Sequence, residues 1–167
     1  EGTVCIDGQE YTIGGLSGQP ERAYIKEEWL ERLSVMPESF MVEDFEVGDI
    51  KEEIKWARRR WALNKEAATG RELVFTLRGS KAMSDIVVKL YFSVYEHIPV
   101  IRKRMEVVNH SAFPVNLTSF KLERLAFAEP ESPVGGNPEK FMLPNIHVES
   151  DFHAGGSFTE KETDVTE

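Results

Sequence analysis

The stretch from Asp85 to Phe127 constrains the fold of this chain more than any other. In its first half, apolar side chains alternate with polar and tyrosine side chains, and the apolar positions are Ile86, Val88, Leu90, Phe92 and Val94. A period of two indicates a strand with one buried face. The turn sequence Glu96–Pro99 follows, and a second alternating run extends from Ile101 to Val107. We predict that the two runs form an antiparallel β-hairpin.

Further runs of the same kind predict strands over much of the chain. They are Val4 to Ile6, Tyr11 to Ile13, Met41 to Val47, Arg71 to Arg78 and an extended segment from Asn145 to Phe152. Between Lys26 and Met36, apolar residues recur at three- and four-residue spacing, which predicts one short amphipathic helix. The predicted fold class is therefore all-β, an antiparallel β-supersandwich with at most one short helix.

The segment from Val115 to Phe127 is also apolar, but its alternation slips twice. One extra residue in a strand moves every later side chain to the other face, so we predict one long strand with bulges. The glycine-rich stretch Gly14–Pro20 and the proline-rich stretch from Glu129 to Pro144 are predicted as loops. The charged tail from Glu160 to Glu167 predicts no regular element.

Length and charge limit the class of protein. We expect residues 1–167 to form a single β-sandwich domain, and the start at Glu1 rather than Met leads us to expect a piece of a longer polypeptide. The formal net charge of −9 argues against nucleic acid as a partner. The apolar runs are shorter than the roughly 20 residues of a membrane helix, so no membrane partner is expected. The single cysteine, Cys5, has apolar neighbours that predict a buried side chain.

The most unusual chemistry lies in the stretch from Ile54 to Trp61, where two tryptophans flank three arginines. Indole rings suit the apolar face of a pyranose, and a guanidinium donates forked hydrogen bonds to oxygen atoms. Trp56, Arg59 and Trp61 are therefore candidate carbohydrate-binding residues. The alternative is that Trp56 packs in the core while the arginines cover the surface with their aliphatic stems.

The histidines suggest weaker candidates for chemistry. His147, Glu149, Asp151 and His153 alternate, so an extended segment would project all four from one face. Two neighbouring members of this set could contribute to a calcium or zinc site, but all four cannot share one ion, and a solvated strand face is the favoured interpretation. His97 and His110 flank one predicted strand and lie too far apart to cooperate. We assign no catalytic residue, no metal site and no cofactor from these patterns.

Several motifs together resemble a known family. They are Gly14–Pro20, Trp29, Trp56–Trp61, Tyr95–Lys103 with Val107–Asn109, and Phe120–Ala126. With these motifs the chain resembles the N-terminal β-supersandwich domain, galactose mutarotase-like in fold, of α-galactosidase-like glycoside hydrolases of family 36 and their bacterial relatives. The resemblance implies a non-catalytic domain that borders the active site of a downstream catalytic barrel, which carries the two catalytic aspartates of that family.

Two other functions stay open at this point. One is an autonomous carbohydrate-binding module that uses Trp56, Arg59 and Trp61. The other is a mutarotase-like epimerase, which needs a histidine and a carboxylate that converge in one pocket. The expected partners are carbohydrate and the downstream catalytic domain of the same polypeptide, and self-association into a homo-oligomer is left open. Removal of a signal peptide would place the protein in the periplasm or outside the cell, and the cytoplasm is the other option.

Overall fold

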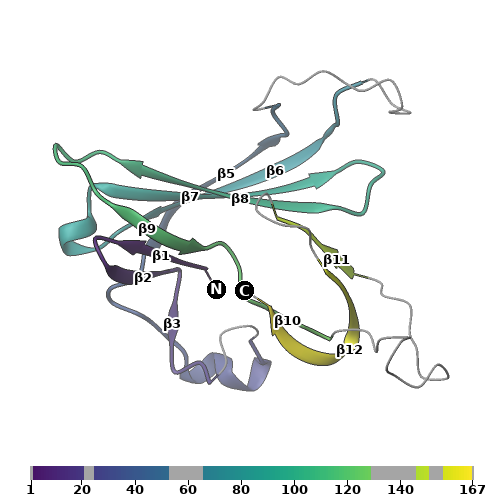
Figure 1. Cartoon of the computed structure of the whole chain (residues 1–167), viewed down its shortest axis with the longest axis horizontal. Helices are drawn as coiled ribbons and strands as arrows, with labels where there is room; N and C mark the ends of the chain where they lie inside the picture. The colour runs from purple at the N-terminus through teal and green to yellow at the C-terminus, as the bar shows by residue number, and fades with distance from the viewer. Residues whose placement is uncertain (1, 21–24, 53–65, 129–145, 151–155, 167) are drawn as a thin grey trace. The chain divides into compact units, whose positions relative to one another are not determined.

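The computed structural model describes residues 2–20, 25–52, 66–128, 146–150 and 156–166, and they form an all-β fold of antiparallel sheets (Figure 1). These residues belong to two units. The larger unit comprises Gly2–Ser17 and Ser34–Leu122, and the smaller unit comprises Gly18–Leu33 and the residues from Glu123 onward. The predicted all-β class is confirmed.

The larger unit contains a long four-stranded sheet and a short three-stranded sheet. The long sheet has the order β5-β6-β7-β8, with β5 at Met41–Asp49, β6 at Gly70–Arg78, β7 at Ile86–Tyr95 and β8 at Ile101–Asn109. The short sheet has the order β2-β1-β9, with β1 at Gly2–Ile6, β2 at Gln9–Ile13 and β9 at Leu117–Lys121. A two-stranded ribbon pairs β3 (Leu16–Ser17) with β4 (Ser34–Val35), and a 3-10 helix, η2, spans Lys81–Met83.

The central hairpin forms as its alternation predicts. β7 and β8 pair antiparallel from Ile86↔Asn109 to Val94↔Ile101 without a slip in register. The strand prediction for Arg71–Arg78 is confirmed by β6, and that for Met41–Val47 is confirmed by β5, which continues to Asp49. Each strand of the long sheet pairs with its neighbour in sequence, so this sheet is built from local connections.

The short sheet begins with the predicted hairpin around Asp7. Asp7 and Gly8 both have positive φ angles, 50° and 84°, which is the geometry of a two-residue type I′ turn. The β9 strand joins the other side of β1, where Val4 lies opposite Phe120. Cys5 lies in β1 and is only half-buried. The prediction of a buried side chain, made from its apolar sequence neighbours, is therefore too strong.

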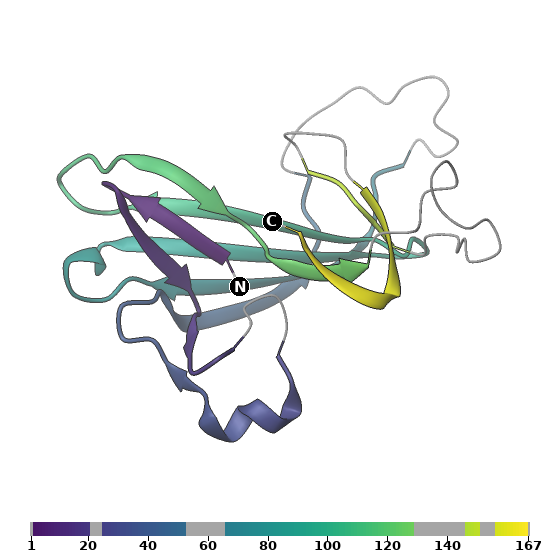
Figure 2. The same ribbon diagram turned by 60° about the horizontal axis from the view of Figure 1, so that its bottom comes forward.

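One apolar core joins the two sheets of the larger unit. Its buried side chains come from β1, β2, β6, β7 and the segment before β5: they are Val4, Ile6, Tyr11, Ile13, Phe40, Leu77, Ile86 and Val88. Figure 2 shows the purple and green strands of the short sheet lying across one face of the long sheet. The ring of Tyr11 meets the ring of Phe40 edge to face, with centroids 6.1 Å apart. Burial of these side chains is the main source of stability for this unit.

The prediction of one bulged strand from Val115 to Phe127 is wrong. The segment forms two strands, β9 and β10 (Leu125–Ala128), which lie in different sheets and in different units. Residues 122–124 separate them. The first slip, between Leu117 and Phe120, lies inside β9, where the register against β1 shifts as it does at a bulge. The second slip, between Leu122 and Leu125, lies where the chain passes from one sheet to another.

The smaller unit contains a three-stranded sheet of order β10-β12-β11, with β11 at Ile146–Val148 and β12 at Gly156–Thr166. The prediction that the charged tail after Glu160 has no regular element is therefore wrong. Its backbone pairs with β10, where Leu125 lies opposite Thr166, and ladder hydrogen bonds do not require apolar side chains. The predicted extended segment after Asn145 is confirmed for β11, and its residues from Asp151 to Phe152 lie outside the described residues.

The predicted helix is present but shorter than expected. A 3-10 helix, η1, spans Glu27–Arg32 and buries Trp29, and β4 begins at Ser34. Leu33 and Met36 therefore lie outside the helix, although they continue its apolar spacing. None of the helical segments that the structure describes is long and apolar enough to cross a membrane.

The core makes a direct prediction about stability. Leu77→Ala removes a side chain that is 2% exposed in the centre of the core, and we expect it to lower the free energy of unfolding by about 2–5 kcal/mol. Ile101→Ala is the matched control, because Ile101 is 75% exposed and should change this free energy by less than about 0.5 kcal/mol. Urea denaturation followed by tryptophan fluorescence measures both. Equal effects of the two substitutions would contradict this assignment of the core.

Candidate functional site

The connections β5–β6 and β7–β8 leave the long sheet at the same end. The register places Asp49 opposite Arg71, Gly70 opposite Tyr95, and Val94 opposite Ile101. We call this the hairpin end of the sheet. Trp56, Arg59 and Trp61 lie in the sequence between β5 and β6, outside the described residues, so their side chains are not placed. The same end carries the turn of the Tyr95–Lys103 motif.

The turn between β7 and β8 is held by hydrogen bonds to Thr69, the residue that precedes β6. The backbone N–H of Glu96 donates to the carbonyl oxygen of Thr69 at 2.9 Å, and the Thr69 hydroxyl donates to the Glu96 carboxylate. His97 then adopts a φ of 62°, in the left-handed region that costs a non-glycine residue about 1 kcal/mol or more. The motif that carries the family resemblance therefore builds a tightly held turn.

A glycine is required where this turn joins β6. A Cβ atom on Gly70 would collide with the carbonyl oxygen of Val94, and it would lie 2.9 Å from Cα of Tyr95. Both atoms belong to the backbone of β7, so the collision cannot be relieved by rotating a side chain. Close pairing of β6 with β7 at the hairpin end depends on this missing side chain.

We expect Gly70→Ala to lower the free energy of unfolding by about 1–3 kcal/mol, as overpacking usually does. Gly48→Ala is the matched control, because among the described residues no atom outside Gly48 and its two chain neighbours lies within 4 Å of a Cβ built on Gly48. Alanine in a strand avoids the entropic cost of glycine, so the control should be neutral or stabilising by up to about 1 kcal/mol. Chemical denaturation of the two variants measures the difference, and a neutral Gly70→Ala would refute the close approach.

Toward the hairpin end, beyond the enclosed core, the core-facing side of the long sheet carries further apolar rows, and Lys103 and the Asp49–Arg71 ion pair lie on the same face. Val47, Leu73 and Phe92 form one cross-strand row, and Phe45, Phe75 and Leu90 form the row before it. The Phe75 ring lies 6.0 Å from the Phe92 ring and 6.4 Å from the Phe45 ring. Several large apolar side chains here are exposed: they are Phe45 at 62%, Val47 at 58%, Val94 at 48%, Ile98 at 51%, Val100 at 46% and Ile101 at 75%. We call these six residues the apolar end.

The opposite face of the same sheet is polar and internally paired. The Arg104 guanidinium lies 3.5 Å from the centre of the Tyr91 ring, and the Tyr91 hydroxyl donates to Glu106 at 2.8 Å. Partial burial and the bond to Glu106 raise the pKa of Tyr91 above its ordinary value. Because Arg104 covers one face of the Tyr91 ring, that face is closed to a sugar ring. This cluster ties β7 to β8 and offers little to a ligand.

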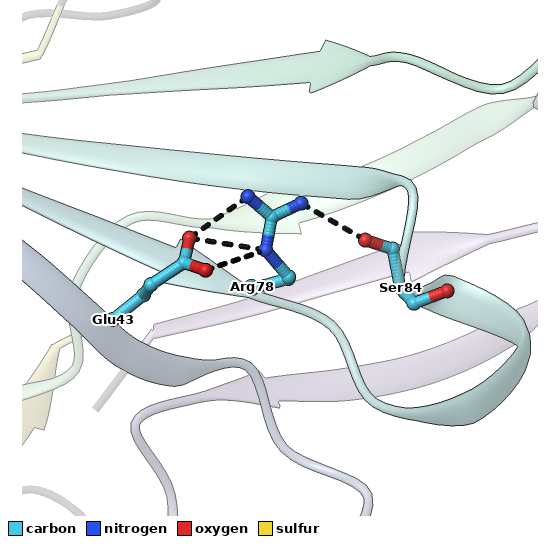
Figure 3. A network of polar contacts seen from close by, with 3 residues as sticks. All are labelled: Glu43, Arg78 and Ser84. Atoms are coloured by element: carbon cyan, nitrogen blue, oxygen red, sulfur yellow. Dashed lines mark hydrogen bonds and ion pairs between the residues drawn. The ribbon is translucent and has the colours of Figure 1, made fainter.

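A second polar contact holds the bulge in the edge strand β5. Register shifts between Val42 and Asp44, at Glu43. Arg78 donates from Nε to both carboxylate oxygens of Glu43 at 2.9 and 3.0 Å, and from Nη1 to the carbonyl oxygen of Ser84 at 3.1 Å (Figure 3). The hydrogen bonds and the positive charge of Arg78 hold the pKa of Glu43 below its ordinary value. The contact joins β5, β6 and the turn between η2 and β7.

The histidines do not converge in the described parts of the chain. His97 and His110 lie beyond opposite ends of the nine-residue strand β8, as the sequence predicts. In the smaller unit, His147 Nε2 lies 2.9 Å from Glu149 Oε1, while Asp151 and His153 lie outside the described residues. Within the parts that the structure describes, no three His, Cys, Asp or Glu side chains are placed to hold a metal ion together.

Comparisons with protein-family models, with curated proteins and with solved structures find no match to this chain. The candidate site therefore stands on the geometry of the larger unit. Sequence reasoning identified the hairpin and its turn, but it missed the apolar end. Alternation showed which residues share a face, yet it could not show that the short sheet leaves part of this face exposed.

The Glu43–Arg78 contact predicts a specific dependence on pH. The folded-state pKa of Glu43 is depressed, so its contribution to stability is present above the unfolded-state pKa of about 4.3 and is lost as pH falls through the folded value. Glu43→Gln should therefore be less stable than the wild type at pH 7, by a small margin because the pair is exposed. The difference between the two proteins should shrink as pH falls below about 4.3 and the carboxylate becomes protonated.

Urea midpoints at pH 7 and pH 3 measure this effect. Glu46→Gln, on the same strand, is the matched control for removal of a charge, because Glu46 lies opposite Val74 rather than beside Arg78. A destabilisation by Glu43→Gln that is equally large at both pH values would show that the charge of Glu43 contributes nothing.

Proposed function

We propose that this chain is a non-catalytic domain of a carbohydrate-active enzyme, an α-galactosidase-like glycoside hydrolase, and that it supports and borders the active site of a downstream catalytic barrel. The all-β sandwich supports this proposal, because it is the fold class that the resemblance implies. The turn formed by the Tyr95–Lys103 motif supports it as well, since one of the motifs that carry the resemblance builds a tightly held turn at the hairpin end.

The observation that carries the proposal is the apolar end. Exposed apolar side chains that gather on one surface mark an interaction site. Covering one such side chain fully is worth about 1.5–3 kcal/mol, so covering several of them supplies enough free energy to hold a domain interface. Five of the six residues are aliphatic, and Phe45 is the one aromatic side chain. Aliphatic surface suits a protein partner better than a sugar, which prefers aromatic faces with polar groups beside them.

The second candidate is an autonomous carbohydrate-binding module. The register favours it in one respect, since the connection that contains Trp56, Arg59 and Trp61 starts and ends at the hairpin end. Under the leading proposal these residues would lie beside the sugar site of the barrel and bind little sugar alone. Under the second they would bind sugar in the isolated chain.

Two measurements on the purified chain separate these functions. A supporting domain should release no nitrophenol from aryl galactosides, should not speed the interconversion of galactose anomers, and should give no heat with a panel of glycans in calorimetry. A carbohydrate-binding module should bind a glycan, and Trp56→Ala and Trp61→Ala should abolish that binding while circular dichroism stays unchanged. Turnover of an aryl galactoside by the pure chain, or faster anomer interconversion, would refute the non-catalytic role.

A further inference from the structure

The sequence contains two acceptor motifs for N-linked glycans in the connection between β8 and β9. The first is Asn109-His110-Ser111, and the second is Asn116-Leu117-Thr118. A transferase recognises asparagine when serine or threonine stands two residues later and proline does not intervene. Such a motif occurs often by chance, so the surroundings of each asparagine decide whether the folded protein can carry a glycan there.

The side chain of Asn109 is used within its own turn. Its Nδ2 donates to the carbonyl oxygen of Phe113 at 2.7 Å, and its Oδ1 accepts the backbone N–H of Ser111 at 2.9 Å. The Ser111 hydroxyl also donates to the carbonyl oxygen of Phe113, at 2.8 Å. A glycan on Nδ2 would have to fit into this turn. Asn109 is therefore a structural residue that closes the connection after β8.

The side chain of Asn116 stands in a different environment. Its backbone is anchored to the Asp7 turn, because its N–H donates to Asp7 Oδ1 at 3.1 Å and its carbonyl oxygen accepts the N–H of Asp7 at 2.9 Å. The residue is exposed, and its successors Leu117 and Thr118 are exposed too. Among the described residues, the structure places no hydrogen-bond partner on the Asn116 side-chain amide. A rigid backbone thus presents a solvent-facing amide just before β9, an edge strand of the short sheet.

We propose that Asn116 is the N-glycan acceptor of this chain and that Asn109 is not. In the transfer, Asn116 Nδ2 bonds to the first sugar carbon of a lipid-linked oligosaccharide. The bond from that carbon to the lipid pyrophosphate breaks, and the amide loses one proton. The β8–β9 connection lies at the end of the long sheet opposite the β7–β8 turn (Figure 1), so a glycan on Asn116 would leave the apolar end accessible. This inference does not depend on the proposed function.

The test uses the whole chain behind a cleavable secretion leader in a eukaryotic secretory host. Intact mass spectrometry before and after peptide N-glycosidase gives the number of glycans, and peptide mapping finds the asparagine that the enzyme converts to aspartate. We expect one glycan, at Asn116. Asn116→Gln and Thr118→Ala should both abolish it, while Asn109→Gln should retain it and lower the urea midpoint through the loss of its turn contacts.

Peptide mapping of the wild-type chain decides the outcome even if a variant fails to fold. A secreted, folded wild-type chain without a glycan would overturn the proposal. A glycan on Asn109, alone or beside one on Asn116, would overturn the claim that the turn excludes it. Loss of the glycan in Asn116→Gln but not in Thr118→Ala would show that modification there does not follow the acceptor motif, and this would also overturn the proposal.

Discussion

The larger unit depends on the apolar contact between a long sheet and a short one. Val4 and Ile6 from β1 meet Leu77 from β6 and Val88 from β7 in a core whose members are almost completely enclosed. The long sheet has strands of nine and ten residues, while those of the short sheet have five. A short sheet of this kind can bury only part of the facing surface. The exposed apolar end is thus a consequence of the difference in strand length, and the proposed function rests on it.

Much of the larger unit could be predicted because its contacts are local. β5 to β8 follow one another in sequence and in space. Alternation in β7 and β8, together with the turn at Glu96–Pro99, defines both the pairing and the register of that hairpin. The Asp7-Gly8 turn defines the β1–β2 hairpin in the same way. In these segments the alternation of the side chains and the backbone hydrogen bonds indicate the same strand pairs.

The errors occur where a strand pairs with a distant part of the chain. β9 pairs with β1, with Phe120 opposite Val4, and β10 pairs with β12, with Leu125 opposite Thr166. No local signal shows that the chain changes sheets between Lys121 and Leu125, so two strands looked like one with bulges. β12 was missed because its charged residues lack an alternating pattern. The apolar end was missed because the exposure of a side chain on one sheet depends on how much of that sheet the other sheet covers, and the sequence pattern of a strand does not show this.

The polar contacts of the larger unit mainly hold strands in place. Arg78 joins Glu43 to Ser84 around the β5 bulge, and Arg104 packs on Tyr91 across β7 and β8. We assign the proposed partner surface to the apolar end, and the connection that contains Trp56 and Trp61 leaves the sheet at the same end. This division separates a structural scaffold from the surface that we assign to an interface.

Hydrogen exchange of the hairpin end tests the central claim most directly. Backbone amides from Val94 to Ile101 would be compared between the isolated chain and the protein encoded by the complete open reading frame, with the core strand β1 as internal reference. Our account predicts slower exchange of these amides in the complete protein and unchanged exchange in β1, because a neighbouring domain covers the apolar end. Equal exchange from Val94 to Ile101 in the two proteins would contradict it.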